Sequence, residues 1–350
     1  MDKISVVAIT KNGIETGKKI KSDFPQYEIF VPEKFSDDTP DITWYSEPTS
    51  NKIAELFKNS NALVCIFSLG AVIRLISPYI KSKKTDPAII VIDDKTDFVI
   101  SVLSGHLGGA NEITRNLAEK LNSIPVITTA ADVNKTISVD LVGRKFGWVI
   151  EDDSTVTRVS AFMVNEEKIG VFQDVGRRDW YEKLPGNVKL FDDIADMTSS
   201  DATGFLVISD RIIDGICLKD SVIYRPPSLV VGVGLHQDTT KETIMNGITC
   251  CLEAARLSPK SVCMLASIKK PQDVPGLAEA GKELGVDVKY VDRDELAKVA
   301  APNPSETVRA FEGTASVSEA AAIISSGGDL VVEKQKFPPD LTIAIARMKK

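Results

Sequence analysis

The chain has 350 residues, 43% of them hydrophobic and 26% charged, which is the composition of a globular protein with two or three domains. The formal net charge of −7 and the lack of a basic stripe argue against a nucleic-acid-binding protein, although a pocket can still be locally positive. No apolar run approaches the roughly 18 residues of a membrane helix. The first residues predict a strand rather than a signal peptide, so we expect a cytoplasmic protein.

The first third of the chain alternates short apolar strands with helical stretches. In chain order, the patterns predict strands at 4–9, 27–31, 62–67, 88–92, 98–103 and 126–128, and helices at 13–21, 53–57, 71–80 and 112–121. Strands that are apolar along their whole length are typical of a largely parallel sheet covered on both faces. Ligands of such sheets bind at the carboxyl ends of strands, where residues 68–70, 104–111 and 128–132 stand.

The middle of the chain, 145–226, has short alternating strands such as 168–172 and 205–208. We interpret its charged turns as solvated loops, at Asp192, Asp193, Asp196 and Asp201. Tandem prolines at 226–227 interrupt both helix and central strand and mark a boundary.

The last third begins again with a predicted strand at 229–234 and a helix that ends near residue 255, capped by Asp238 or Thr239. A strand–helix unit at 262–284 follows, and then a strand at 288–291, helices at 294–299 and 316–325, and strands at 330–334 and 341–346. We therefore predict an α/β protein with mostly parallel sheets in an N-terminal domain (1–140) and a C-terminal domain (228–350), joined by a smaller α/β domain (141–227).

The cysteines are spaced for packing rather than for metal binding or redox chemistry. No CxxC pair occurs among the five, and neither histidine stands near a cysteine at ligand spacing; they are Cys65, Cys217, Cys250, Cys251 and Cys263. We expect no structural zinc site, and we expect the adjacent Cys250 and Cys251 to be buried in a helix.

Residues 104–111, Ser-Gly-His-Leu-Gly-Gly-Ala-Asn, place one of only two histidines among glycines between a predicted strand and a predicted helix. Glycines at such a junction bring backbone N–H groups close to a ligand, and an imidazole adds acid–base chemistry near neutral pH. In the functional interpretation His106 handles protons, and the groups that hold the ligand or add hydrogen bonds are Ser104, Gly105, Gly108, Gly109 and Asn111. The alternative is a structural turn capped by Asn111, and the octet alone leaves both open. It matches neither a dinucleotide fingerprint nor a phosphate loop, so a bound nucleotide is not supported.

Two other strand ends carry candidate binding groups. Arg74, one helical turn after Gly70, is placed to clamp a carboxylate, and candidates to line the same crevice are Thr128, Thr129 and Asp132. In the last third Gly232 and Gly234 precede His236 in a similar turn. The structural alternatives are an exposed helical arginine, threonine caps and an ordinary glycine turn. No Ser-His-Asp or Cys-His order is recognisable, so a covalent nucleophile is not indicated.

Taken together, several segments resemble the cobalt-precorrin-5A hydrolase family of anaerobic cobalamin biosynthesis, called CbiG. The resemblance covers the first and last thirds well and the middle third weakly; it runs through residues 70–74, 86–88, 91–93, 103–112, 126–130, 231–234, 266–268, 275–277, 304–306, 317–321 and 342–347. In one departure, the family's C-terminal module is expected to continue its glycine turn with a Cys-Arg-Arg-like segment, whereas this chain has Leu235-His236-Gln237.

The resemblance implies hydrolytic opening of the ring-A δ-lactone of cobalt-precorrin-5A, with release of acetaldehyde, to give cobalt-precorrin-5B. It implies His106 as general acid or base, the N–H groups of Gly108 and Gly109 on a carboxylate or oxyanion, and Arg74 and Arg115 on peripheral carboxylates of the macrocycle. It implies no cofactor bound by the protein, since cobalt arrives within the tetrapyrrole substrate, and partners among the neighbouring methyltransferases of the pathway. Two alternatives stay open, which are a tetrapyrrole carrier without chemistry and an enzyme acting on a phosphorylated or sugar-like ligand.

Overall fold

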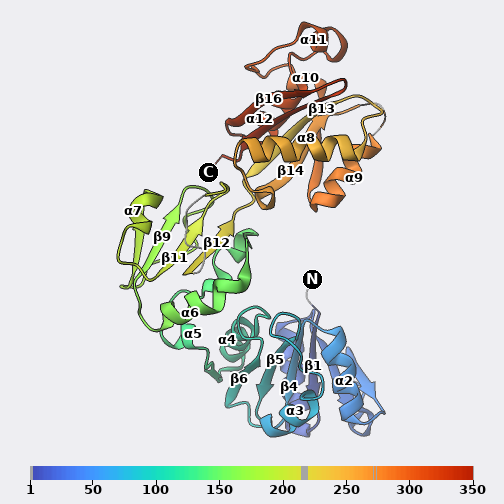
Figure 1. Cartoon of the computed structure of the whole chain (residues 1–350). Coiled ribbons are helices and arrows are strands. Elements are labelled where there is room, and N and C mark those ends of the chain that lie inside the picture. The colour runs from blue at the N-terminus through green and yellow to red at the C-terminus, as the bar shows by residue number, and fades with distance from the viewer. Residues whose placement is uncertain (1–2, 214–219, 271, 273, 350) are drawn as a thin grey trace. The chain divides into compact units, whose positions relative to one another are not determined.

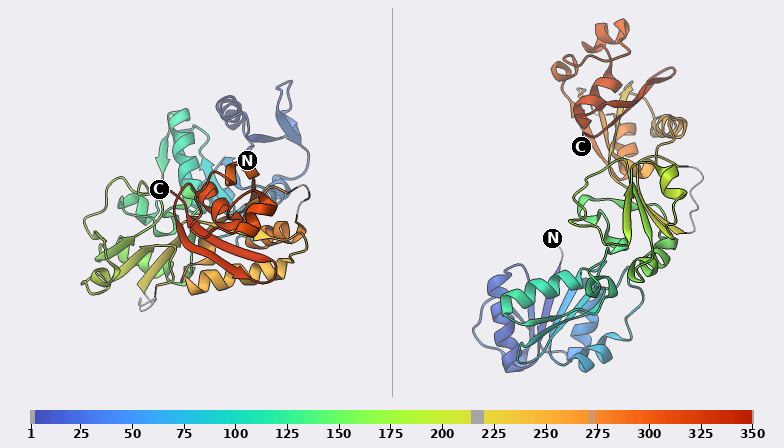
Figure 2. Two further views of the ribbon diagram at one scale, coloured as in Figure 1. Left: turned by 90° about the horizontal axis from the view of Figure 1, so that it is seen from above. Right: turned by 90° about the vertical axis from the view of Figure 1, so that its left-hand side faces the viewer.

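The computed structural model describes residues 3–213, 220–270, 272 and 274–349, so that Cys217 lies outside the described residues. The chain divides into two compact units, Met1–Leu141 and Val142–Lys350 (Figures 1 and 2). The first unit holds a seven-stranded sheet, and the second holds two five-stranded sheets. The predicted α/β class with mostly parallel sheets is confirmed. One sheet falls within each of the ranges 1–140, 141–227 and 228–350.

The strands of the first unit lie in the order β3-β2-β1-β4-β5-β6-β7. Their bounds are β1 Ile4–Ala8, β2 Glu28–Pro32, β3 Ile42–Tyr45, β4 Ala62–Ile66, β5 Ala88–Ile92, β6 Phe98–Leu103 and β7 Ile124–Val126. The helices are α1 Lys11–Asp23, α2 Thr49–Asn59, α3 Leu69–Ile76, α4 Ala110–Leu121 and α5 Ala130–Val133. Strands β5 and β6 have the predicted bounds, whereas β7 lies two residues before the predicted 126–128. Strand β3 was not predicted, because it is a four-residue edge strand without a continuous apolar run.

Helices cover both faces of this sheet, as a doubly wound fold requires. Ile14 of α1 and Leu117 of α4 share one apolar core, and Ile53 of α2 packs in a second core with Val72 of α3. Successive residues of a strand point to opposite faces, so Val6 and Val7 of β1 belong to different cores. This double burial is why the strands read as unbroken apolar runs.

The direction of β6 decides which loops meet. Strands β1 to β5 are parallel, but β6 runs antiparallel to β5 and β7 runs parallel to β6. Leu103 at the end of β6 therefore lies opposite Ile89 at the start of β5. The segments that follow β6 and β7 lie at one edge of the sheet, and the segment that follows β4 lies at the other. The expectation of one common crevice for residues 68–70, 104–111 and 128–132 is therefore wrong.

The first sheet of the second unit has the order β10-β9-β11-β12-β8, in which only β8 is antiparallel. Its elements are β8 Val149–Ile150, α6 Val156–Val164, β9 Ile169–Gln173, β10 Val188–Phe191, α7 Ile194–Thr198, β11 Gly204–Ile208 and β12 Ser221–Arg225. Asp196, predicted in a loop, lies in α7, because the side chain of Asp193 accepts hydrogen bonds from the first amides of that helix and starts it there.

The last sheet has the order β15-β14-β13-β17-β16. Strands β13, β14 and β15 are parallel, β17 runs antiparallel to β13, and β16 runs antiparallel to β17. Its elements are β13 Leu229–Leu235, α8 Lys241–Ala254, β14 Val262–Ile268, α9 Pro275–Leu284, β15 Asp287–Val291, α10 Arg293–Leu296, α11 Glu306–Glu312, α12 Val317–Ser326, β16 Leu330–Phe337 and β17 Leu341–Arg347. Thr240 caps α8 in place of the predicted Asp238 or Thr239. Cys251 is buried but Cys250 is exposed, because adjacent residues of a helix point in different directions.

Candidate active site around His106

The octet forms a tight turn that leads from β6 into α4. Ser104 has φ of 55° and Gly109 has φ of 83°, so the backbone is left-handed at both positions, and Gly109 is the N-cap of α4. A Cβ on Gly108 would lie 2.8 Å from the carbonyl oxygen of Ser104, which leaves no room for a side chain. Asn111 is the second residue of α4 rather than its cap, because the helix begins two residues before the predicted 112–121.

His106 lies between two carboxylates. Its Nε2 is 3.0 Å from Oδ2 of Asp132, and its Nδ1 is 3.3 Å from Oδ1 of Asp140. Only 16% of its side chain is exposed, and the two aspartates are exposed to a similar extent. Because a carboxylate accepts hydrogen bonds, a proton on each ring nitrogen satisfies both contacts. This arrangement favours the imidazolium form.

The electrostatics agree with that geometry. The hydrogen bond to Asp140 and then that to Asp132 raise the pKa of His106 above its usual range, against the opposing effect of burial. For Asp132, burial by itself raises the pKa, but hydrogen bonds from Arg115 and His106 outweigh it and lower the pKa below the usual range. Both shifts favour an ion pair between a protonated His106 and a deprotonated Asp132.

Asn111 and Arg115 hold Asp132 in place from α4. The amide of Asn111 donates to Asp132 Oδ2 at 2.8 Å and to Thr129 Oγ1 at 3.0 Å, while its carbonyl accepts from Ser101. Arg115, one turn further along the helix, forms an ion pair with Asp132. Gly105 makes this possible, because a Cβ there would lie 2.7 Å from Oδ1 of Asn111.

The remaining groups of the octet are mostly used inside the turn. The Ser104 hydroxyl donates to the carbonyl of Asp86 at 2.9 Å, which fastens the octet to the segment before β5. The N–H of Gly109 donates to the carbonyl of His106 at 3.1 Å, and the next two amides donate to carbonyls of the same turn. Gly109 therefore does not offer the free donor that the sequence predicts. The N–H of Gly108 has no partner within the described part of the chain.

Gly70 and Arg74 lie at the opposite edge of this sheet, on α3 after β4. The length of a five-residue strand separates the two edges, which is roughly 16 Å. Arg74 is exposed, and its guanidinium is 3.4 Å from the carbonyl of Gly70 and has no carboxylate partner among the described residues. Helix α3, which carries Arg74, follows β4, and β4 lies beside β1 where the strand order reverses and doubly wound sheets bind ligands. Thr128 and Thr129 instead follow β7 on the side of His106, where Thr129 bonds Asn111 and Thr128 is exposed.

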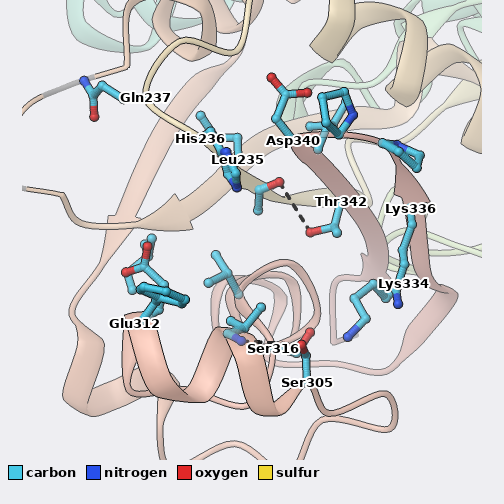
Figure 3. Close-up of a pocket in the computed structure, with 18 of the residues that line it drawn as sticks. Leu235, His236, Gln237, Ser305, Glu312, Ser316, Lys334, Lys336, Asp340 and Thr342 are labelled. Atoms are coloured by element: carbon cyan, nitrogen blue, oxygen red, sulfur yellow. Dashed lines mark hydrogen bonds between the residues drawn. The ribbon is translucent and has the colours of Figure 1, made fainter.

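The C-terminal glycine turn belongs to the second unit. Gly232 is buried, and a Cβ there would lie 1.9 Å from the carbonyl of Ser318 in α12, so this glycine serves helix packing and does not reach a ligand. Gly234 and the exposed His236 line a pocket of about 740 Å³ (Figure 3). The turn is therefore accessible at Gly234 and at His236.

Comparisons with known proteins decide the family. Three family models match consecutive parts of the chain: Cobalamin synthesis G N-terminal at residues 51–132, Cobalamin biosynthesis central region at 137–226 and Cobalamin synthesis G C-terminus at 229–346. A cobalt-precorrin-5A hydrolase from Priestia megaterium is 40% identical, covering 98% of this chain and 94% of that protein. The chain belongs to the cobalt-precorrin-5A hydrolase family.

Two further proteins are less similar to this chain. The cobalt-precorrin-5A hydrolase of Salmonella typhimurium is 28% identical, covering 95% of this chain and 94% of that protein. Among solved structures, a cobalamin biosynthesis protein G homologue from Sulfolobus solfataricus is 25% identical, with a TM-score of 0.39 over 99% of this chain and 97% of its own.

Sequence reasoning on this family member missed Asp140 altogether. Asp140 stands 34 positions after His106 in a 3₁₀ turn, Val139–Leu141, and no motif links the two. Asp132 was only a candidate crevice residue. The signal that places Asp132 beside the octet is the five-residue connection between β5 and β6, which is too short for a parallel crossover and requires a hairpin.

Within the described residues, no helix is long and apolar enough to cross a membrane.

Proposed function

We propose that this chain is a cobalt-precorrin-5A hydrolase, which opens the ring-A δ-lactone and releases acetaldehyde to give cobalt-precorrin-5B. The 40% identity to the Priestia megaterium relative over nearly the whole of both chains carries the proposal. The cluster around His106 supports it from the side of chemistry, since it offers a proton donor held between carboxylates in a partly buried turn.

The first chemical step is addition of water to the lactone carbonyl, in which the water loses one proton to solvent, followed by cleavage of the acyl–oxygen bond to give a carboxylic acid and an alkoxide. The leaving alkoxide needs a proton, and the imidazolium of His106 supplies it. Asp132 and Asp140 hold that imidazolium in place and stabilise its charge. The unpartnered N–H of Gly108 is a donor for the oxyanion formed during the addition.

The second step breaks the carbon–carbon bond that joins the two-carbon fragment to the ring. The hydroxyl freed by lactone opening loses its proton, its oxygen becomes the carbonyl of acetaldehyde, and the bonding electron pair returns to the macrocycle with a proton from solvent. His106, neutral after the first step, is the base that takes the hydroxyl proton. One residue thus acts first as acid and then as base, and Asp132 and Asp140 support both states.

Substrate recognition falls to different groups at the two edges of the first sheet. Arg115 forms an ion pair with Asp132, so its role is to position that carboxylate as much as to bind substrate. Arg74 has no carboxylate partner among the described residues and is the arginine more available to a substrate carboxylate. We infer that the protein needs no cofactor of its own, that cobalt arrives in the substrate, and that neighbouring methyltransferases in the cytoplasm hand it over.

Anaerobic incubation of the purified chain with cobalt-precorrin-5A tests the proposal. We expect acetaldehyde together with the corresponding loss of mass from the macrocycle. Binding of the macrocycle without acetaldehyde would instead make the protein a carrier. The phosphate-ligand alternative has lost support, because three successive amides at the start of α4 are bonded within the turn and are not free to cradle a phosphate.

A further inference from the structure

The second unit contains a pocket that the chemistry proposed for His106 does not use. Its volume is about 740 Å³, within the range of small-molecule sites. It lies at the carboxyl ends of β13 and β14, between the turn that joins β16 to β17 and the segment that contains α11 (Figure 3). Segments that carry the family resemblance supply part of its lining, namely Gly234, Ser305 and Val317.

The pocket has a positively charged side. Lys334 and Lys336 of β16 both line the pocket, and Figure 3 shows them together on one side of it. The ammonium group of Lys334 donates to the carbonyl of Asn303. Lys336 is exposed and has no hydrogen-bond or ion-pair partner among the described residues. It is therefore available to an anion.

Of the acidic groups that line the pocket, Glu312 has a cationic partner, whereas the partner of Asp340 is a neutral hydroxyl. Glu312 forms an ion pair with Arg293 at 3.2 Å, and Asp340 accepts a hydrogen bond from the hydroxyl of Thr239 at 3.3 Å. Lys270, on the opposite strand end, directs its ammonium to the carbonyl of Leu235 at 2.6 Å. The carboxylate of Asp238 is exposed at the rim. Lys336 on β16 therefore stays available to an anionic group of a ligand.

A large apolar group faces the same space. Phe311 of α11 is 77% exposed, the highest value among the exposed large hydrophobic side chains of the described residues. Val308, one turn earlier, also lines the pocket. An aromatic ring left this open to water at the mouth of a pocket is suited to stack on a flat ligand. A ligand that suits this pocket has a flat face for Phe311 and anionic groups for Lys336. A conjugated macrocycle with peripheral carboxylates has both.

We propose that this pocket binds a carboxylate-bearing tetrapyrrole, with Lys336 on a peripheral carboxylate and Phe311 against the ring. The identity of the ligand rests on the proposed function, whereas the charge and shape of the pocket do not. The pocket lies in the second unit, whereas His106 lies in the first, and the proposal assigns a binding role to the C-terminal part of the chain.

Hydrogen exchange of the full-length protein, read by mass spectrometry, tests this site directly. The probe is cobyrinic acid, a stable cobalt corrinoid with free carboxylates, and its amidated analogue cobinamide, which has no peripheral carboxylate, is the comparison. We expect cobyrinic acid to protect peptides that cover residues 234–242, 305–316 and 330–342, and we expect cobinamide to protect them much less. Absence of protection there, or equal protection by citrate, would overturn the proposal.

Variants of exposed residues then assign the contacts without disturbing the fold. Lys336→Ala should weaken binding of cobyrinic acid about threefold to tenfold, since one partly exposed ion pair is lost. Phe311→Leu keeps an apolar side chain but loses the flat ring, and it should weaken binding about fivefold. Lys289→Ala, on the exposed surface of β15 outside the pocket, is the matched control. Equal affinities for all three variants and the unmodified protein would refute the assignment.

The acetaldehyde assay separates this inference from the proposed function. Acetaldehyde release without protection of the pocket would leave the hydrolase intact and remove the binding site. Protection by cobyrinic acid without acetaldehyde release from cobalt-precorrin-5A would do the reverse, because the pocket would still bind an anionic tetrapyrrole.

Discussion

At the scale of single residues, the state of His106 is set by its two carboxylate partners. A histidine in a loop has an ordinary pKa near neutral pH, and either form is available to it. Here both ring nitrogens face aspartates, and the pKa is raised by Asp140 first and Asp132 second. The imidazole is therefore positioned to start as an acid.

Removal of His106 should abolish most of the activity without unfolding the protein. His106→Ala leaves the turn intact, because the glycines and Ser104 form its backbone contacts. We expect acetaldehyde release to fall by about 10²–10⁴-fold, the range for a lost acid–base group. Near-normal turnover by a folded variant would remove His106 from the mechanism.

The pH dependence of activity should change when Asp140 loses its charge. Asp140 is the largest cause of the raised pKa of His106, so Asp140→Asn lowers that pKa. Turnover that requires the imidazolium is lost as pH rises through the pKa, and in the variant this loss should begin at a lower pH. A pH profile of the initial rate measures the shift, and an unchanged alkaline side would contradict an acid role for His106.

The free energy of unfolding should depend on pH through the protonation of His106. A raised pKa in the folded state stabilises the protein fully below the unfolded value, and that contribution is lost as pH rises through the folded value. Urea unfolding at increasing pH above about 6.5 should therefore show a decline that His106→Ala reduces. Identical pH dependence in both proteins would show that the ion pairs contribute nothing to stability.

At the scale of elements, the entry into α4 depends on one glycine without space for a side chain. Gly108→Ala places a Cβ 2.5 Å from the Cβ of Ser104 and should destabilise the fold by about 1–3 kcal/mol. Gly70→Ala is the control within the same unit, since its new Cβ would meet only Arg74, at 3.7 Å, and alanine favours a helix. Denaturant unfolding compares them, and equal stabilities would contradict the steric argument.

Arg74 and Arg115 lie at opposite edges of the first sheet, so we expect their removal to have different effects. Arg74→Ala should weaken substrate binding and leave the pH profile unchanged, because Arg74 lies on the edge away from His106. Arg115→Ala removes an ion-pair partner of Asp132 and should change the pH profile as well. Binding titrations and rate profiles distinguish these effects, and identical behaviour of both variants would place the arginines in one site after all.

At the scale of the whole molecule, the two sheets of the second unit are joined by an ion pair whose carboxylate is buried. Asp210 is fully buried after β11, and its two oxygens accept hydrogen bonds of 2.8 Å from Arg347 at the end of β17. Ser228, at the start of β13, donates to the same carboxylate. The last strand of the chain is thereby tied to the middle sheet.

Loss of this ion pair should destabilise the second unit strongly. Asp210→Ala removes hydrogen bonds to the charged guanidinium of Arg347, which is partly exposed, and should cost about 2 kcal/mol of the free energy of unfolding. Asp201→Ala removes a surface ion pair with Lys168 in the same sheet region and should have no measurable effect. Similar losses in the two variants would argue against Asp210 as the link between the sheets.

The sequence by itself determined the α/β class, most strands and the octet, because strands buried on both faces must be apolar along their length. It identified His106, Asn111 and Thr129, which the structure brings together. Only the tertiary structure decided the partners of His106, because Asp140 enters through chain packing that no local pattern records. In the structure, Arg74 lies at the edge of the sheet opposite to His106, and not in the same crevice as Thr128 and Thr129. The physical reason is the hairpin between β5 and β6. It makes β6 and β7 run opposite to the other strands, so the loops that follow these two strands lie at the opposite edge of the sheet.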